Sequence, residues 1–208
     1  MSALDRIAHQ QNRRDEVPNQ ELARELVERK DREGIREIAE NLWNKDKNIQ
    51  ADCVKVLYEI GYIDPSLIAG FADDFLKLLR SRNNRLIWGG MIALSTVAEL
   101  RADLIHTHLK EILNAMDKGS AITVDNAVRV LALAASKDAY REFIFPHLLE
   151  HLRTCRPKDV AQHAEKSLPA VGASNKDEFI AVLEKRMEDL SGAQLNRVKK
   201  VIRAAVSR

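Results

Sequence analysis

Hydrophobic and small residues recur along the chain with a period of 37 residues. Steps of this size from Leu57 reach Leu94, Leu131 and Leu168. Four and eight residues before each leucine, and three residues after it, the positions are again small or apolar, apart from one threonine. Spacings of i, i+4, i+8 and i+11 place these positions on one stripe of an amphipathic helix. The pattern therefore predicts one such helix in every unit of the repeat.

A second helical pattern follows each stripe after a short polar break. The breaks "YIDPS", "LRAD", "ASKD" and "GASNKD" contain Asp, Asn, Ser, Gly or Pro, which are typical of helix caps and turns. After the first two breaks, "LIAGFADDFLKLL" and "LIHTHLKEILNAM" again place apolar residues on one face. Each unit is thus predicted to be a helical hairpin. A single hairpin buries little apolar surface, so neighbouring hairpins are expected to stack.

The repeat predicts one domain over residues 19–208. Its main part, residues 46–190, divides into four units of about 37 residues, near 46–82, 83–119, 120–156 and 157–190. Residues 19–45 hold two helical patterns and are predicted to form a divergent first unit or cap. Residues 191–208 are predicted to form a capping helix. Residues 1–18 are largely polar and are predicted to be a mobile tail.

The third helical pair is the most regular part of the repeat. Residues 124–135, "VDNAVRVLALAA", and the later "FPHLLEHL" resemble the HEAT and armadillo class of helical repeats, and the resemblance covers about residues 46–190. It implies an all-α fold, a right-handed α-α superhelix (solenoid) of HEAT-like hairpins. Many members of the class carry an Asp–Arg ladder between first helices. At the arginine position of that ladder this chain has Gln50, Ile87, Val124 and Ala161, which indicates a diverged branch.

Composition narrows the class of partner. Charged residues make up 31% of the chain, and the formal net charge is +2, which is small for a protein that neutralises many phosphates. The two cysteines form no CxxC pair, and no apolar run approaches the roughly 20 residues that span a bilayer. We therefore expect a cytoplasmic protein that does not contact membranes, either a monomer or a weak homodimer.

The polar residues of the second helices are the expected binding surface. In the HEAT and armadillo class these helices usually line the concave face of the stack. Their mixed charge suits a protein or peptide partner better than a phosphate backbone. The expected contact residues are Asp73, Asp74, Lys77, Lys110, Glu111, Asn114, His147, His151, Glu184, Lys185 and Glu188. The predicted function is a non-enzymatic protein-interaction scaffold or adaptor with no catalytic residue and no cofactor.

One first helix carries apolar residues opposite its core stripe. Trp88 and Ile92 lie one helical turn apart, and Arg85 is beside them. An exposed pair of this kind would form an apolar contact for a partner or a second subunit. Alternatively, the amino-terminal helices or a long neighbouring side chain cover it. The sequence does not decide between the two interpretations.

A histidine motif raises the question of zinc. "HLLEH" places His147 and His151 at i and i+4 with Glu150 between them, as in a zinc hydrolase helix. These residues also lie opposite the apolar stripe of the same helix, so a solvated polar face is the preferred interpretation, and no metal is predicted. His163 has no neighbour of metal-ligand type in the sequence.

An alternative function belongs to another class. The same repeat architecture is found in some DNA glycosylases, so a nucleic-acid-binding or DNA base-excision (alkylation-repair-like) protein stays open. Candidates for such a site are Trp88, Asp138, Tyr140 and Arg141, although no common spacing unites them. The carboxy-terminal "NRVKKVIRAAVSR" is basic and contains no acid. It fits nucleic acid or an acidic protein, but cations near the end of a helix also complement its dipole.

Overall fold

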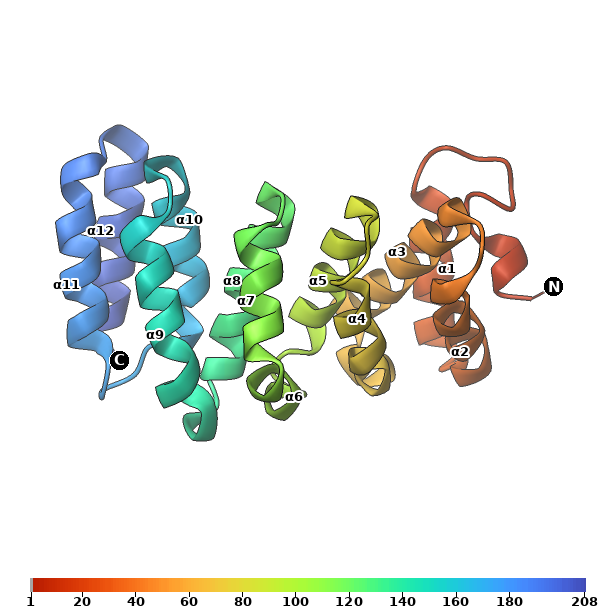
Figure 1. The fold of residues 1–208 in the computed structure, drawn as a ribbon, viewed down its shortest axis with the longest axis horizontal. Helices are drawn as coiled ribbons and strands as arrows, with labels where there is room; N and C mark the ends of the chain where they lie inside the picture. The colour runs from red at the N-terminus through yellow and green to blue at the C-terminus, as the bar shows by residue number, and fades with distance from the viewer. Residues whose placement is uncertain (1) are drawn as a thin grey trace.

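The computed structural model describes residues 2–208 as helices joined by short turns, with no strand in that range (Figure 1). The α-helices are α1 (Val17–Glu28), α2 (Arg32–Glu40), α3 (Lys47–Ile63), α4 (Ala72–Leu78), α5 (Asn84–Val97), α6 (Ala102–Thr107), α7 (Leu109–Asp117), α8 (Ala121–Ala135), α9 (Asp138–Thr154), α10 (Pro157–Ser167), α11 (Lys176–Arg186) and α12 (Gly192–Val206). Short 3-10 helices cover Leu4–Arg6, Asn41–Trp43, Pro65–Leu67, Ala69–Phe71, Leu168–Ala170 and Met187–Asp189.

The helices form two layers of a repeating stack. One layer consists of α1, α3, α5, α8, α10 and α12, each in contact with the next along the chain. The second layer holds α2, α4, α6 with α7, α9 and α11 (Figure 1). Four helices of the first layer begin at Lys47, Asn84, Ala121 and Pro157, at intervals of 37, 37 and 36 residues. The predicted all-α stack of helical hairpins is confirmed.

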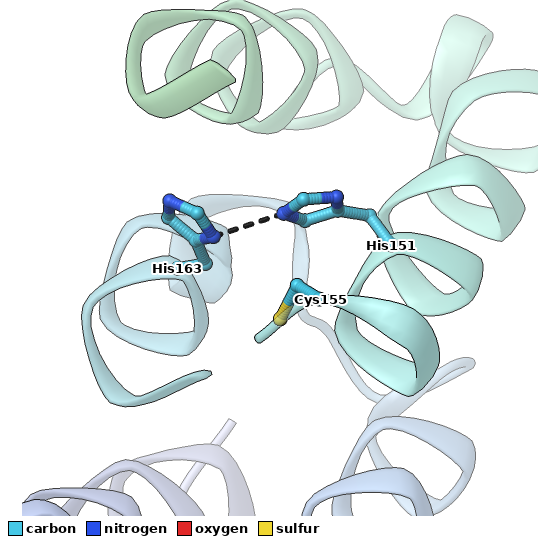
Figure 2. A group of neighbouring side chains, drawn as sticks. All are labelled: His151, Cys155 and His163. Atoms are coloured by element: carbon cyan, nitrogen blue, oxygen red, sulfur yellow. Dashed lines mark hydrogen bonds between the residues drawn. The ribbon is translucent and has the colours of Figure 1, made fainter. Parts of the chain in front are cut away.

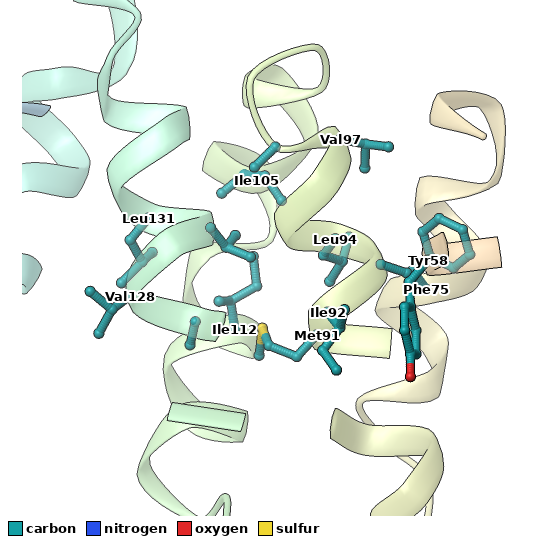
Figure 3. Close-up of a cluster of buried hydrophobic side chains, with 14 of the residues drawn as sticks. Tyr58, Phe75, Met91, Ile92, Leu94, Val97, Ile105, Ile112, Val128 and Leu131 are labelled. Atoms are coloured by element: carbon teal, nitrogen blue, oxygen red, sulfur yellow. The ribbon is translucent and has the colours of Figure 1, made fainter. Parts of the chain in front are cut away.

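The apolar stripe forms the core between the layers. Leu57, Leu94 and Leu131 are fully buried, and Figure 3 shows Leu94 and Leu131 within the central cluster. Small residues allow the helices to approach closely. A Cβ atom on Gly90 would lie 2.9 Å from the backbone oxygen of Phe75 in α4. The last leucine of the stripe, Leu168, is only half-buried, because α10 ends at Ser167 and a 3-10 helix takes over.

Capping side chains recur with the same period. Asp46, Asn83 and Ser120 precede α3, α5 and α8, and each side chain accepts a hydrogen bond from a backbone N–H of the first turn. Such caps satisfy amide groups that have no partner inside the helix. The equivalent residue before α10 is Arg156, whose side chain makes no capping bond, and Pro157 begins the helix instead. The unit that starts with α10 therefore departs from the repeat at its first residue.

The first part of the amino-terminal segment is packed against the stack, so the prediction of a mobile tail over residues 1–18 is wrong for residues 3–9, and residues 17–18 already belong to α1; residue 1 lies outside the described residues. Ile7 is fully buried, and Ala8 is nearly so. The backbone N–H of Ala8 donates to Asn19 Oδ1 at 2.9 Å, and that of His9 donates to Asp52 Oδ2 at 2.7 Å. These bonds tie the segment to α1 and α3. The few apolar residues of a mostly polar segment were enough to pack its first part, whereas residues 10–17 are exposed.

The carboxy-terminal helix completes the first layer. Helix α12 packs against both α10 and α11. Arg197 in α12 makes two hydrogen bonds to Glu165 in α10, at 2.6 and 2.8 Å. Every helix of residues 2–208 is too short or too polar to serve as a membrane-spanning segment.

Candidate functional site

Two grooves lie at equivalent positions of the repeat, two units apart. The first, here called the tryptophan groove, has a volume of about 740 Å³ and lies between the ends of α3, α4 and α5. The second, here called the histidine groove, has a volume of about 510 Å³ and lies between α8, α9 and α10. Lys77 and Ser81 of the first correspond in the repeat to His151 and Cys155 of the second. The same architecture thus presents two different sets of side chains.

The tryptophan groove combines an exposed aromatic ring with positive charge. Trp43 is 50% exposed. No carboxylate is among the described residues that line the groove. Besides Trp43 they are Lys47, Gln50, Lys77, Leu78, Arg80, Ser81, Arg82, Asn83, Asn84 and Leu86. Arg80 forms a two-bond pair with Glu111 at 2.5 and 2.8 Å, and Lys77 contacts Asp74 at 3.1 Å. No salt bridge within residues 2–208 holds Lys47 or Arg82, so these two are the groove's free cations.

A hydrogen-bonded turn holds Trp43 in place. Leu42 is fully buried and anchors the 3-10 helix Asn41–Trp43 in the core. The Asn44 side-chain amide donates to Asn41 Oδ1 at 2.8 Å, and the backbone N–H of Asp46 donates to Asn44 Oδ1 at 3.0 Å. The tryptophan is therefore presented to solvent by a fixed backbone. Trp43 was not among the site residues predicted from the sequence. A tryptophan that lies outside the repeated apolar positions and between two asparagines was the sequence signal that could have identified it.

The histidine groove contains three side chains of metal-ligand type. His151 is in the last turns of α9, Cys155 caps that helix and His163 is in α10 (Figure 2). His151 Nε2 and His163 Nδ1 lie 2.9 Å apart and share a hydrogen bond. One nitrogen from each imidazole and the Cys155 sulfur all lie within 4.8 Å of one another. His163 is buried, while His151 and Cys155 are half-buried.

Burial sets the protonation of this cluster. Desolvation, together with the charge of His163, lowers the pKa of His151 to about 4. Desolvation also lowers the pKa of His163 and raises the pKa of the Cys155 thiol. Near neutral pH the cluster therefore holds two uncharged imidazoles and a protonated thiol.

A carboxylate lies behind the buried histidine. Asp125 Oδ1, from α8, is 3.5 Å from His163 Nε2, the ring nitrogen that faces away from His151. Asp125 is itself fixed by an ion pair with Lys166 and by a hydrogen bond from Gln162 at 2.6 Å. This arrangement orients the imidazole, because a carboxylate at one ring nitrogen favours a proton there and leaves the other nitrogen as an acceptor.

The predicted contact residues of the second helices have different environments. Asp74, Lys77 and Glu111 take part in the pairs described above. His151 was expected on an open polar face. That expectation is wrong, because the side chain is half-buried and faces His163 of α10 (Figure 2). Residues that are exposed include Asp73, Lys110, Asn114, His147, Glu184, Lys185 and Glu188.

The "HLLEH" motif does not form the zinc arrangement that its spacing offers. His147 is exposed and stays outside the cluster around His151. The expectation that His163 has no ligand-type neighbour is wrong, because the turn between α9 and α10 brings it to His151. Cys155 at i+4 from His151 was the readable signal, since that spacing places both on one side of α9.

Ile92 does not form an outward contact with Trp88. Ile92 is 8% exposed, so the expectation of an exposed Trp88 and Ile92 pair is wrong. Trp88 is half-buried beside Asn19, Tyr58 and the amino-terminal residues Ala8 and Arg13. Arg85 is exposed at the edge of the same pocket. The packed amino-terminal segment, which was expected to be a mobile tail, lies against this face of the stack.

The candidates for a base-excision site do not form one site. The Arg141 guanidinium pairs with Asp138 at 2.7 Å and donates to the backbone oxygen atoms of Ala135 and Ser136. Tyr140 packs on the ring of His106, with centroids 5.2 Å apart. Trp88 belongs to the separate amino-terminal pocket. Arg141 and Asp138 thus serve the turn between α8 and α9.

Comparisons with known proteins support the fold. No protein-family model and no curated protein matches the sequence. An engineered protein solved by the Northeast Structural Genomics Consortium superposes with a TM-score of 0.67 at 18% identity, over 100% of this chain and 96% of that chain. A designed armadillo repeat protein, solved in complex with the peptide (KR)4, superposes with a TM-score of 0.67 at 17% identity over 99% of both chains. The chain thus has the helical-repeat fold of armadillo and HEAT-like proteins.

Proposed function

We propose that this protein is a non-enzymatic binding module for a protein or peptide, and that the tryptophan groove receives an acidic segment with an apolar side chain. The observation that carries the proposal is the combination of a half-exposed Trp43 with four cations and no carboxylate along a groove of about 740 Å³. Tryptophan and arginine are the residue types that most often dominate binding energy at protein interfaces.

The charges of the groove favour an acidic occupant. Arg80 and Lys77 are already partnered by Glu111 and Asp74, which leaves Lys47 and Arg82 to pair with a ligand. A carboxylate on the ligand would form charge-assisted hydrogen bonds with them. Helix ends and a hydrogen-bonded turn build the groove, so little ordering is needed on binding. An apolar side chain of the ligand would pack on the Trp43 ring.

The exposed residues of the second helices extend the proposed surface. Lys110, Asn114, His147 and Lys185 are exposed on α7, α9 and α11, where the sequence predicted partner contacts. The designed armadillo repeat protein in complex with a peptide supports the proposal that a stack of this fold can bind a peptide. Its peptide is basic, whereas the groove of this protein is complementary to an acidic one.

Nucleic acid is the competing occupant, because a tryptophan beside cations also suits a stacked base. Two free cations would neutralise few phosphates, and the net charge of the whole chain is only +2. The groove therefore favours a polypeptide. Salt dependence separates the two ligands, since phosphate contacts release many counterions and weaken steeply as salt rises.

The test is a fluorescence anisotropy titration with a labelled peptide rich in Glu and Leu, its counterpart with Lys in place of Glu, and a single-stranded oligonucleotide. We expect the acidic peptide to bind and Trp43→Ala to weaken it about tenfold or more, the equivalent of about 1.4 kcal/mol. Arg82→Glu should also weaken it. Phe143→Ala, which removes an exposed aromatic ring elsewhere, and Lys199→Glu are the matched controls and should leave affinity unchanged.

Three outcomes would overturn the proposal. The first is equal affinity of wild type and Trp43→Ala for the acidic peptide. The second is no binding of the acidic peptide. The third is preferential binding of the oligonucleotide with a steep salt dependence, which would favour the nucleic-acid function instead.

A further inference from the structure

We infer that His151, Cys155 and His163 form a binding site for a single zinc ion at the junction of α9 and α10. The site is separate from the tryptophan groove and does not depend on the proposed peptide binding. Two imidazoles and one thiolate are a ligand set that suits zinc, which accepts nitrogen and sulfur donors in tetrahedral geometry. Three protein ligands would leave one position for water or for a group of a bound partner.

The first argument is the convergence of the three donor atoms. His151 Nε2 and His163 Nδ1 are 2.9 Å apart, and one nitrogen of each ring and the Cys155 sulfur all lie within 4.8 Å of one another (Figure 2). Donor atoms about 2.0 to 2.3 Å from one zinc ion lie at separations of this order. A small outward movement of the two rings would replace their shared hydrogen bond with two metal bonds.

The second argument is the carboxylate behind His163. Asp125 Oδ1 faces His163 Nε2 at 3.5 Å, so Nε2 can hold the proton while Nδ1 offers its lone pair toward His151 and Cys155. Metal-binding histidines commonly have such a carboxylate at the other ring nitrogen. Asp125 is held in turn by Lys166 and Gln162, so a buried histidine is supported by a fixed outer partner.

The third argument is that the cluster occurs at one junction of the repeat. The positions equivalent to His151 in the two preceding units are Lys77 and Asn114, and those equivalent to Cys155 are Ser81 and Lys118. His163 corresponds to Gly89 and Asn126. Stacking of the hairpins therefore does not need these side chains. In α5 the corresponding position is a glycine packed against Val54, whereas in α10 it is a buried imidazole.

The fourth argument is the surroundings of the cluster. The groove beside it has a volume of about 510 Å³, so an ion can enter from solvent. Asp159 lines the same groove and pairs with Arg156 at 2.7 Å. On binding, Cys155 would bond to zinc as the thiolate and its proton would pass to solvent.

The experiment uses the full chain, purified and stripped of metal, and titrated with Co²⁺ as a spectroscopic substitute and then with Zn²⁺. We expect one equivalent of Co²⁺ to produce thiolate charge-transfer absorption and the visible bands of tetrahedral cobalt, and Zn²⁺ to displace it. Cys155→Ser should remove the charge-transfer band, and His163→Gln should weaken binding at least tenfold. His147→Gln changes an exposed histidine of the same helix and should bind as wild type does.

A second readout does not depend on the stability of the variants. Zinc should protect Cys155 of the wild-type protein from alkylation, as measured by mass spectrometry, while Cys53 is buried with or without metal and serves as the internal control. The inference is overturned if wild type shows no cobalt–thiolate band and no protection of Cys155. It is also overturned if His147→Gln reduces binding as much as His163→Gln does.

Discussion

Single residues decide how closely the layers approach. Gly90 faces the backbone of α4, where an added Cβ would be 2.9 Å from Phe75 O and also 2.9 Å from Leu78 Cβ. Contacts of that length force a shift of the backbone or the leucine. The sequence signalled this position, because Gly90 shares its column of the repeat with Cys53, Ala127 and Ala164.

We therefore expect Gly90→Ala to lower the free energy of unfolding by about 1–3 kcal/mol, as overpacking in a dense core does. Denaturant unfolding followed by circular dichroism would measure it. Gly70→Ala is the matched control, because nothing lies within 4 Å of its added Cβ. An unchanged midpoint for Gly90→Ala would show that α4 and α5 do not pack as described.

The sequence predicted which side chains pack in the core better than it predicted which polar side chains meet in a site. The period of 37 residues predicts which side chains face the core, since that depends on spacing within one helix. The approach of His163 to His151 depends on the turn at Arg156 and Pro157, where the repeated capping pattern stops. Ile92 lies outside the core stripe of its helix, so spacing within that helix did not predict its burial. The sequence therefore predicted contacts between helices only where the same contact recurs in every unit of the repeat.

At the scale of elements, an ion pair joins α12 to α10. The Arg197 guanidinium donates two hydrogen bonds to Glu165 in α10, and these bonds lower the pKa of the Glu165 carboxyl below its ordinary value. A carboxyl with a lower pKa in the folded state stabilises the fold above its ordinary pKa of about 4.5. The stabilisation is lost as the pH falls and the folded carboxyl is protonated.

We expect wild type to lose more stability than Glu165→Gln between about pH 6 and pH 3, by up to about 1 kcal/mol, because both partners are partly exposed to solvent. Thermal unfolding across that pH range would measure the difference. Parallel pH profiles for the two proteins would mean that the pair contributes nothing to the docking of α12.

At the scale of the whole molecule, stability comes from hairpins that contact only their neighbours. Leu131 lies fully buried in α8, which packs against α5, α9 and α10. Loss of its side chain leaves a cavity at the centre of the stack. The 37-residue register placed Leu131 there from sequence alone. It did not predict where α10 gives way to a 3-10 helix or that Ala8 and His9 are bonded to α1 and α3.

Leu131→Ala should cost about 2–5 kcal/mol of unfolding free energy, as for other packed core leucines. Ile122→Ala, in the same helix but 47% exposed, should cost far less. Denaturant titrations of the two variants would compare them. Equal stabilities would contradict the assignment of Leu131 to the core of the repeat.

The proposed binding function rests on the tryptophan groove, and the two tryptophans of the chain allow it to be tested separately from the rest of the molecule. Trp43 is half-exposed in the tryptophan groove, whereas Trp88 lies in the pocket beside the amino-terminal segment. The most direct measurement is a nitrogen–proton correlation spectrum of the indole N–H groups during titration with the Glu- and Leu-rich peptide, with Trp88→Phe to assign them. We expect the Trp43 signal to shift until it saturates while the Trp88 signal stays fixed. A fixed Trp43 signal at a peptide concentration that saturates anisotropy would contradict it.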